Sequence, residues 1–195
     1  MKKFYIGFAI LFVLGVGAGI YYLEVYRKGN VHLPEDVVME SAFGEEVDFA
    51  DLPKRARIVE FMYTRCPDVC PVTTLEMAKL KTQLEEDGIW GDKVEFMTIT
   101  IDPERDTTET MQDYANRFEV ESDDDGWLFL RGSEEDTRKI ADKFNFLYRD
   151  PGDGNMNHTS LVYFMDGSGN LLDQFTMGED FNREKAYKRI MRTVR

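Results

Sequence analysis

The sequence predicts an α/β domain built on a mixed β-sheet flanked by helices, with an N-terminal hairpin and, ahead of it, an N-terminal transmembrane helix. Three observations predict this architecture. Short β-branched and aromatic runs alternate with amphipathic helical segments along most of the chain, which is typical of a sheet with helical connections. Two strand patterns separated by a Gly-containing turn follow, and they add an antiparallel pair. A charge-free apolar run stands at the N-terminus.

The apolar run extends from Phe4 to Leu23 and contains no charged residue. At a rise of ~1.5 Å per residue, a helix of this length spans a hydrocarbon core of ~30 Å. The apolar part of a secretory signal usually has only about 7–15 residues, so an uncleaved anchor is favoured over a long signal peptide. We therefore divide the chain into residues 1–28, a cytoplasmic tip with a membrane anchor, and residues 29–195, one globular domain.

Basic residues flank the run on both sides, with Lys2 and Lys3 before it and Arg27 and Lys28 after it. The α-amino group before the run and Glu24 after it favour a cytoplasmic amino terminus. No Arg-rich transit segment precedes the run. We therefore expect a single-pass protein of a bacterial or archaeal cell membrane, with the large domain on the extracytoplasmic side.

The globular part contains strand and helix patterns in a regular order. A hairpin is predicted at 37–40 and 45–49, and strands are predicted at 58–62, 94–101 and 127–130. Helices are predicted from Pro71, from a cap at Asp106–Glu109 to about Phe118, and from a cap at Ser133–Asp136 to about Leu147. The chain ends with a predicted hairpin, 159–165 and 171–177, and an amphipathic helix at 181–194.

The composition is strongly acidic, with a formal net charge of −13 at pH 7. Nucleic acids and anionic lipid surfaces are poor partners for such a protein, because both repel excess negative charge. Cations or a basic patch on another protein suit it better. The excess charge is equally consistent with a purely solubilising role.

Both cysteines of the chain lie where an apolar strand pattern gives way to a helix. Cys66 falls in the predicted strand–helix loop, and Cys70 falls at the helix N-terminus. There the helix dipole and the unpaired N–H groups favour a negative charge, and Arg65 adds a positive one. We therefore expect a stabilised thiolate, the form of cysteine that attacks disulfides and binds metals.

The spacing of the two cysteines allows both kinds of chemistry. Residues four apart on a helical turn share a face, with Cα atoms about 6 Å apart, so Cys66 and Cys70 can form a disulfide or bind one soft metal ion. A purely structural disulfide is the alternative. It is disfavoured because closing so short a loop stabilises a fold by only about 2 kcal/mol.

His158 is the predicted third ligand. It follows the Gly- and Pro-containing loop 150–157 and immediately precedes a strand. In an α/β sheet the crevice lies at the carboxyl ends of the parallel strands, where the cysteine loop also lies, so a mobile loop can bring the imidazole to the sulfurs. A surface or capping role is the alternative for His158. The other histidine, His32, has no chemical residue nearby and is interpreted as solvated.

Two thiolates and one imidazole favour copper, because soft sulfur binds Cu(I) and a mixed sulfur–nitrogen set also binds Cu(II). A structural zinc site prefers a fourth protein ligand, and the sequence offers none. Met156 is a candidate weak sulfur donor. The strand methionines Met62, Met97 and Met165 are interpreted as core residues.

These features together resemble the Sco (SenC) family of copper-binding, membrane-anchored proteins. The resemblance lies in the run from Cys66 to Pro71, the run from Thr100 to Thr107, and His158 ahead of a strand, and it extends from about residue 35 to 192. It implies a thioredoxin-like fold, a redox-active pair formed by Cys66 and Cys70, and copper, as Cu(I), Cu(II) or both, held by this pair and His158.

The resemblance also implies a role in assembling the dinuclear copper centre of cytochrome c oxidase, by delivering copper or by reducing the cysteines of the target. The implied partners are a copper-accepting oxidase subunit or another cupredoxin-like protein, and a protein that supplies thiol reductant. The loop around Met156 and the acidic surface are not part of the family pattern, so a different acceptor protein is left open.

Two other functions compete with a copper metallochaperone. The first is a metal-independent thiol–disulfide oxidoreductase, although that class usually has Cys-x-x-Cys and here one more residue separates the pair. The second is a peroxidase of the thioredoxin superfamily. Thr64, two residues before Cys66, faintly resembles the signature of that class, but the proline of the usual peroxidatic signature is absent. Copper titration of the reduced protein distinguishes the copper metallochaperone from the oxidoreductase, and peroxide turnover tests the peroxidase.

Overall fold

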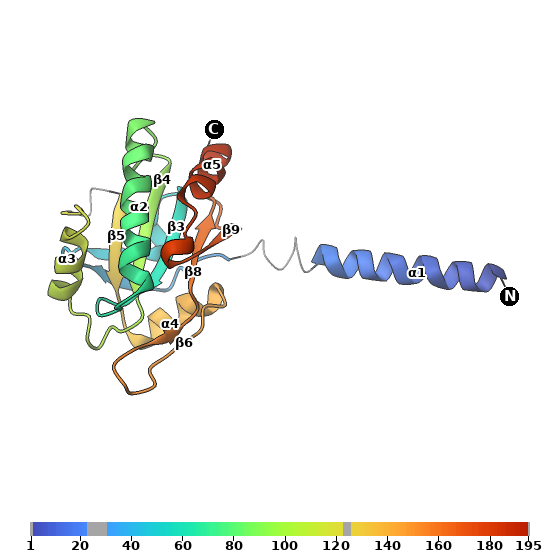
Figure 1. The fold of residues 1–195 in the computed structure, drawn as a ribbon, viewed down its shortest axis with the longest axis horizontal. Helices are drawn as coiled ribbons and strands as arrows, with labels where there is room; N and C mark the ends of the chain where they lie inside the picture. The colour runs from blue at the N-terminus through green and yellow to red at the C-terminus, as the bar shows by residue number, and fades with distance from the viewer. Residues whose placement is uncertain (1, 23–30, 123–125, 195) are drawn as a thin grey trace.

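A mixed β-sheet lies at the centre of the structure, a computed structural model that describes residues 2–22, 31–122 and 126–194 (Figure 1). Within these ranges the sheet has seven strands in the order β2-β1-β5-β4-β3-β8-β9. Pairing is parallel among β3, β4 and β5 and antiparallel elsewhere. The predicted α/β class, the mixed sheet and the N-terminal hairpin are therefore confirmed. The strands are β1 (Val38–Ser41), β2 (Glu46–Asp48), β3 (Ala56–Met62), β4 (Val94–Thr100), β5 (Trp127–Arg131), β8 (Leu161–Met165) and β9 (Leu171–Thr176).

The two central strands, β3 and β4, consist mostly of apolar residues because both are covered on two faces. Every residue of β3 and β4 is buried, and the two strands pair in register from Ala56 opposite Val94 to Met62 opposite Thr100. Parallel strands covered on both faces have no solvent side that would demand alternating polar residues. Because β3, β4 and β5 run in the same direction, their carboxyl ends and the loops that follow lie at one edge of the sheet.

Helices cover the sheet, and α2 (Val69–Glu86) runs along it directly after the cysteine loop (Figure 1). Its buried side chains include Met77, Leu80 and Leu84, at the spacing of one helical face. The predicted caps form, because Thr107 accepts from the N–H of Thr110 and Ser133 accepts from the N–H of Asp136. The remaining helices are α3 (Thr108–Asn116), α4 (Glu134–Lys143) and α5 (Arg183–Val194).

Two helices end earlier than the sequence predicts. Helix α4 stops at Lys143 rather than near Leu147, and Asn145 then takes a left-handed conformation with φ of 51°. This turn directs Phe144 and Phe146 into the core, where both are buried. Helix α3 similarly stops at Asn116 before Phe118. After α4 the burial of these two aromatic side chains outweighs continued helical propensity, whereas Phe118 after α3 is only partly buried.

The N-terminal helix α1 spans Lys2–Tyr21, and its described side chains are exposed. Among the helices that the described residues form, none has the length and apolar character needed to cross a membrane. The predicted end of the anchor at Leu23 and the boundary between residues 28 and 29 lie outside the described residues.

Candidate metal centre

The loop between β3 and α2 carries both cysteines. Cys66 lies in a turn in which its N–H donates to the carbonyl of Tyr63 at 3.1 Å, and Cys70 lies in the first turn of α2. The buried carboxylate of Asp106 holds the start of this loop by accepting from the Thr64 N–H at 3.0 Å and from the Thr64 hydroxyl. A residue after β4 therefore fixes the loop that follows β3.

His158 reaches the same place from a small second sheet. Strands β6 (Tyr148–Arg149) and β7 (Asn157–His158) pair antiparallel, with Tyr148 opposite His158. The pairing continues at Thr159, whose N–H donates to the carbonyl of Leu147 at 2.9 Å. The loop predicted as mobile thus begins and ends in a hydrogen-bonded ladder, and this ladder positions the histidine.

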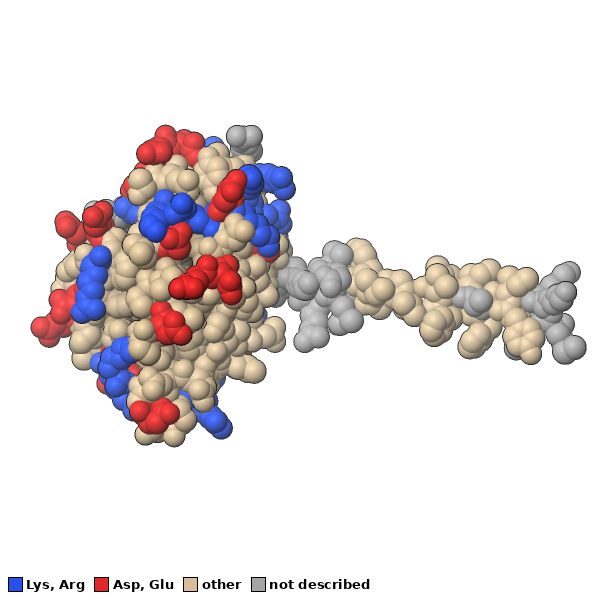
Figure 2. All heavy atoms as spheres, viewed as in Figure 1, with Lys and Arg blue, Asp and Glu red and all other residues tan. Residues whose placement is uncertain are grey.

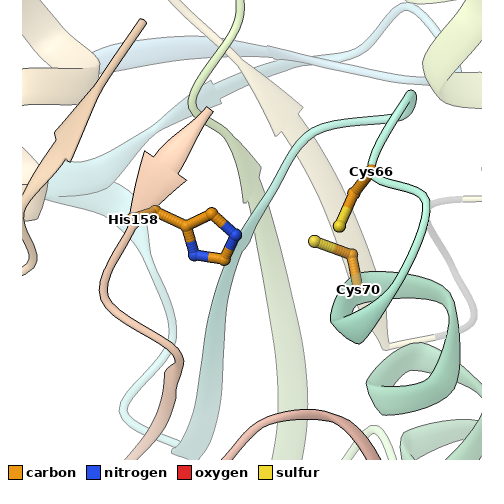
Figure 3. Close-up of side chains that lie close together, drawn as sticks. All are labelled: Cys66, Cys70 and His158. Carbon is orange, nitrogen blue, oxygen red and sulfur yellow. The ribbon is translucent and has the colours of Figure 1, made fainter. Parts of the chain in front are cut away.

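The three predicted ligands converge. The Sγ atoms of Cys66 and Cys70 and a ring nitrogen of His158 all lie within 4.8 Å of one another, and both cysteines are free thiols. Figure 3 shows the imidazole ring directed toward the two sulfurs. Nδ1 of His158 lies 3.0 Å from the carbonyl oxygen of Thr159. When Nδ1 is protonated it donates to that oxygen, and Nε2 keeps its lone pair for a ligand.

Aromatic side chains hold the imidazole ring on two sides. Phe146 stacks on it with ring centroids 6.0 Å apart and an angle of 20° between the planes, and Tyr63 meets it edge-on, also at 6.0 Å. Both aromatic residues are buried. This packing restricts the orientation of the ring, and neither residue is marked by any motif in the sequence.

The two sulfurs differ in acidity, and the difference is opposite to the one expected from the helix N-terminus. The hydrogen bond from the Cys70 thiol, with a smaller contribution from His158, outweighs burial and lowers the pKa of Cys66 to about 4. Donating that bond and being buried raise the pKa of Cys70 far above its ordinary value. The stabilised thiolate is therefore Cys66, in the loop, because it accepts the hydrogen bonds.

The imidazole of His158 responds to the same thiolate. Burial lowers the pKa of His158, but the hydrogen bond to Cys66 and the contact with the carbonyl of Thr159 outweigh it, and the net shift is upward. A metal ion that takes the Cys66 thiolate removes the main partner of the imidazolium. Metal binding therefore favours the neutral ring that can act as a ligand.

Arg65 forms an ion pair beside the cysteine loop. Its guanidinium pairs with the buried carboxylate of Asp102 at 2.9 Å. Asp102 also pairs with Arg105 at 3.2 Å, and Arg105 in turn contacts Asp150 at 2.8 Å through two nitrogens. The stabilisation of a cysteine thiolate by Arg65 therefore stays a prediction. The arginines instead connect the cysteine loop, the loop after β4 and the start of the segment that leads to His158.

Two other predicted residues have clear places. His32 is exposed and lies against Gly169 in the turn between β8 and β9, and it is not a member of the ligand cluster. Met156 is partly buried against the core, and its role as a weak sulfur donor stays a prediction.

Asp102 and Asp106 were predicted as parts of a turn and a helix cap. In the structure Thr107 makes the cap. The two aspartates instead contact the cysteine loop, Asp102 through Arg65 and Asp106 through Thr64.

Comparison with known proteins agrees with this geometry. The SCO1/SenC family model matches residues 32–195. A SCO2-like protein of Rickettsia felis is 28% identical over 195 residues, which cover 90% of this chain and 91% of that protein.

Solved structures are similar as well. ScoI of Bradyrhizobium japonicum with copper bound has a TM-score of 0.66 and 28% identity, and the match covers 80% of this chain and 96% of that one. BsSco, described as a Sco family cytochrome c oxidase assembly protein with a disulfide switch, has a TM-score of 0.72 at 22% identity. That match covers 85% of this chain and 94% of that one. The fold of these proteins is therefore also the fold of this chain.

Proposed function

The chain belongs to the SCO1/SenC family, and from this premise we propose that it is a copper-binding protein whose ligands are Cys66, Cys70 and His158. The observation that carries this proposal is the convergence of two sulfurs and one imidazole nitrogen within 4.8 Å. The copper-bound relative from Bradyrhizobium japonicum supports the choice of metal.

The donor set suits copper on chemical grounds. Two thiolates and an imidazole form a soft site, and soft ligands select Cu(I) over the hard cations that prefer oxygen. Among the described residues the cluster includes no fourth His, Cys, Asp or Glu, which a closed structural zinc site would require. Cys70 is fully buried and Cys66 nearly so, and a site shielded from water in this way protects a bound ion from exchange.

We propose further that the protein serves in assembling the dinuclear copper centre of cytochrome c oxidase. It would deliver copper to that centre or reduce the cysteines that bind it. The description of BsSco as a member of a family of cytochrome c oxidase assembly proteins supports this role. The partners would then be an oxidase subunit or another cupredoxin-like acceptor and a thiol-reducing protein, because a disulfide between Cys66 and Cys70 cannot bind copper.

Copper titration tests the ligand set. The reduced protein is titrated with copper, and absorption from sulfur-to-copper charge transfer is recorded in wild type, His158→Ala and His32→Ala. We expect one copper per chain in wild type and in His32→Ala, which removes the other histidine, and at least tenfold weaker binding in His158→Ala. Unchanged stoichiometry and affinity in His158→Ala would remove the three-ligand site.

A metal-independent thiol–disulfide oxidoreductase is the second candidate function. It is favoured by the contrast between an acidic thiol at Cys66 and a buried thiol at Cys70, because a thiolate attacks a disulfide and a neighbouring thiol resolves the mixed disulfide. Reduction of a disulfide-linked target peptide by metal-free His158→Ala, at the wild-type rate, would support it. Failure of the metal-free wild-type protein to reduce the peptide would contradict it.

We also propose that the N-terminal helix attaches the protein to a bacterial or archaeal cell membrane, with the large domain on the extracytoplasmic side. The support is the charge-free sequence from Phe4 to Leu23 and the exposure of apolar side chains such as Leu11 and Phe12 on α1. Fractionation of cells that express the full chain, with carbonate extraction and protease treatment of intact cells, tests it. Recovery of the full chain in the soluble fraction would contradict the attachment.

A further inference from the structure

Helix α5 is basic although the protein as a whole is acidic. Between Arg183 and Val194 it has five basic residues and one acidic residue, whereas the chain carries a net charge of −13. Figure 2 shows basic side chains near α5, on the side of the domain from which the chain leads to α1. A groove between α5 and β9, here named the basic groove, is lined by Lys185, Lys188, Arg189 and Arg192 and by the acidic side chains of Asp173 and Glu184.

Acidic side chains neutralise only part of the charge in the basic groove. Glu184 pairs with Lys188 at 2.6 Å. Asp173 pairs with Lys185 at 3.3 Å and with Arg189 at 3.8 Å. Four cations thus line the groove against two carboxylates, and ion pairs this close to solvent are weak enough for an outside anion to compete for the cations. The groove therefore keeps a net positive charge that is available to a ligand.

Apolar side chains border the basic groove. The guanidinium of Arg189 donates to the carbonyl of Leu172 at 3.2 Å, and the side chains of Leu171 and Leu172 are only half-buried at the start of β9. The ammonium group of Lys185 lies 5.2 Å from the centre of the Phe175 ring. Cationic groups beside apolar groups are typical of surfaces that lie on phospholipid headgroups, because the charges meet phosphates while the apolar groups meet the boundary of the acyl chains.

The chain enters the domain close to this groove. His32 lies against Gly169 in the turn between β8 and β9, and Asp173 of the groove is four residues farther along, at most about 14 Å away. Seven residues, 24–30, separate the predicted anchor from the described start of the domain, and so short a segment spans at most about 25 Å. With α1 in a membrane, as proposed above, the part of the domain that carries the groove is therefore held near the lipid surface.

The metal centre lies at the other end of the domain. The Tyr187 hydroxyl of α5 donates at 2.8 Å to Asp87, which follows the last turn of α2, whereas Cys70 lies in the first turn of α2. At a rise of ~1.5 Å per residue these two ends of α2 are about 25 Å apart. The turn between β8 and β9 likewise lies against Lys54, just before β3, whereas the cysteine loop follows β3. A membrane at the basic groove therefore leaves the metal centre uncovered.

We propose that the basic groove binds headgroup phosphates of anionic phospholipids in the membrane that carries α1 and thereby fixes the orientation of the domain. Each lysine or arginine at an anionic lipid surface raises the bound population about fivefold. The remaining surface is acidic and is repelled by the same lipids, so the attraction acts on this one face and only within a Debye length of about 8 Å. The whole chain is thus a poor partner for anionic lipid, whereas this face is a good one.

This inference rests on the proposed attachment through α1 and does not depend on copper. It adds an orientation to the attachment, with the sulfur pair and His158 directed away from the lipid. An acceptor protein would then reach the metal centre without displacing the domain from the membrane.

Lysine labelling of the full chain in lipid nanodiscs tests the orientation. Nanodiscs of phosphatidylcholine alone, or of phosphatidylcholine mixed with phosphatidylglycerol, are treated with an acetylating reagent and analysed by mass spectrometry. At low salt we expect Lys185 and Lys188 to react about tenfold more slowly in the anionic nanodiscs, and at about 1 M salt this difference should vanish. Lys139 and Lys143 on α4 should react alike in both lipids. Equal reactivity of Lys185 and Lys188 in the two lipids at low salt would overturn the proposal.

A charge-reversal variant tests which side chains are responsible. In Lys188→Glu/Arg192→Glu the remaining Lys185 serves as the reporter, and we expect it to react at the same rate in both lipids. Lys139→Glu/Lys143→Glu makes the same change of net charge on α4 and should keep the slow reaction of Lys185 in anionic nanodiscs. Slow reaction of Lys185 in both variants, or its loss in both, would overturn the proposal. The labelling of wild type decides by itself if a variant does not fold.

Two further outcomes separate this inference from its alternatives. Gel filtration shows whether the chain enters nanodiscs at all, and failure to enter would contradict the attachment through α1. Labelling in suspensions of neutral and anionic vesicles would then decide on the basic groove. Slow reaction of Lys185 and Lys188 in the presence of polyglutamate, but with neither lipid, would assign the groove to an acidic protein and overturn the lipid proposal.

Discussion

Cys66 and Cys70 are chemically different although only three residues separate them. Cys66 accepts hydrogen bonds in the loop, and Cys70 donates one from a fully buried position. Cys66 therefore combines the lower pKa with the greater exposure, and both properties favour it as the first sulfur to meet a partner disulfide or an incoming ion.

Alkylation of the metal-free reduced protein measures this difference. We expect iodoacetamide to modify Cys66 first, at a rate that changes little between about pH 6 and pH 8, whereas a thiol of ordinary pKa loses about tenfold in rate per pH unit below about 8.5. Mass spectrometry of the modified peptides identifies the site. Faster modification of Cys70, or a rate that rises steeply over this range, would contradict the assignment of the thiolate.

Glu60 should make stability depend on pH. In the folded reduced protein burial raises the pKa of Glu60 from 4.5 to about 8, so between these values the folded state holds a proton that the unfolded chain has lost. The contribution of Glu60 to the free energy of unfolding therefore falls as the pH rises from 5 to 8, by an amount on the order of a few kcal/mol, whereas the Cys66 thiolate, with a pKa of about 4, contributes a rise over the same range in both wild type and Glu60→Gln. Glu60→Gln should lack this fall. Urea denaturation of both proteins at pH 5 and pH 8 measures this difference. A free energy of unfolding that changes with pH by the same amount in wild type and Glu60→Gln would contradict the prediction.

At the scale of elements, the start of α2 depends on a glycine far along the chain. Gly178 lies in the short 3₁₀ helix η4 (Gly178–Asp180), with φ of 76°, and its N–H donates to the Thr73 hydroxyl at 2.7 Å. A Cβ atom at this position would lie 3.1 Å from Cγ1 of Val69, the first residue of α2. The position therefore requires glycine for both backbone conformation and space.

Gly178→Ala tests this contact against Gly44→Ala, a matched control. Gly44 also has positive φ, but a Cβ there meets no atom within 4 Å. Both changes should cost about 1–3 kcal/mol of unfolding free energy from backbone strain. Only Gly178→Ala should also weaken copper binding, because it displaces Val69 and thereby Cys70. Equal effects of the two variants on copper affinity would show that the contact between Gly178 and Val69 does not position Cys70.

The segment that carries His158 is connected to the loop after β4 by the ion pair between Arg105 and Asp150. Both side chains are partly exposed, so the pair is screened by salt and its effect is small. We expect Asp150→Asn to speed amide hydrogen exchange between Asp150 and His158 and to weaken copper binding a few-fold at low salt. At high salt the variant and wild type should converge. A difference that persists at high salt would point to a steric effect.

At the scale of the molecule, the hydrophobic core lies entirely within the globular domain. Its buried apolar residues run from Val31 to Ile190, and the described part of α1 contributes none. Acidic and basic side chains are interspersed on the face shown in Figure 2. On that face the acidic side chains therefore do not form one continuous patch.

Removal of residues 1–30 should leave the folded domain intact. We expect the unfolding free energy and the copper stoichiometry of residues 31–195 to match those of the full chain in detergent. Calorimetry and copper titration of both forms check this. A large loss of stability in the shorter form would show that α1 packs on the domain.

The sequence alone determined the α/β class, the order of the helices and of the strands of the seven-stranded sheet, and the three candidate ligands, but it did not predict the small sheet of β6 and β7. Local patterns were sufficient for these, because apolar periodicity and capping residues act over a few positions, and the spacing of Cys66 and Cys70 is itself local. The run from Cys66 to Pro71 also sufficed for the family resemblance.

Only the tertiary structure decided which sulfur is acidic, what holds His158, and which buried carboxyl lacks a cation. Each of these depends on contacts between distant segments: His158 with Phe146 and Tyr63, Arg65 with Asp102, and Glu60 with Thr98. Burial and hydrogen bonding set a pKa, and both arise only when strands far apart in the sequence pack together. For this reason the helix N-terminus alone predicted the wrong thiolate.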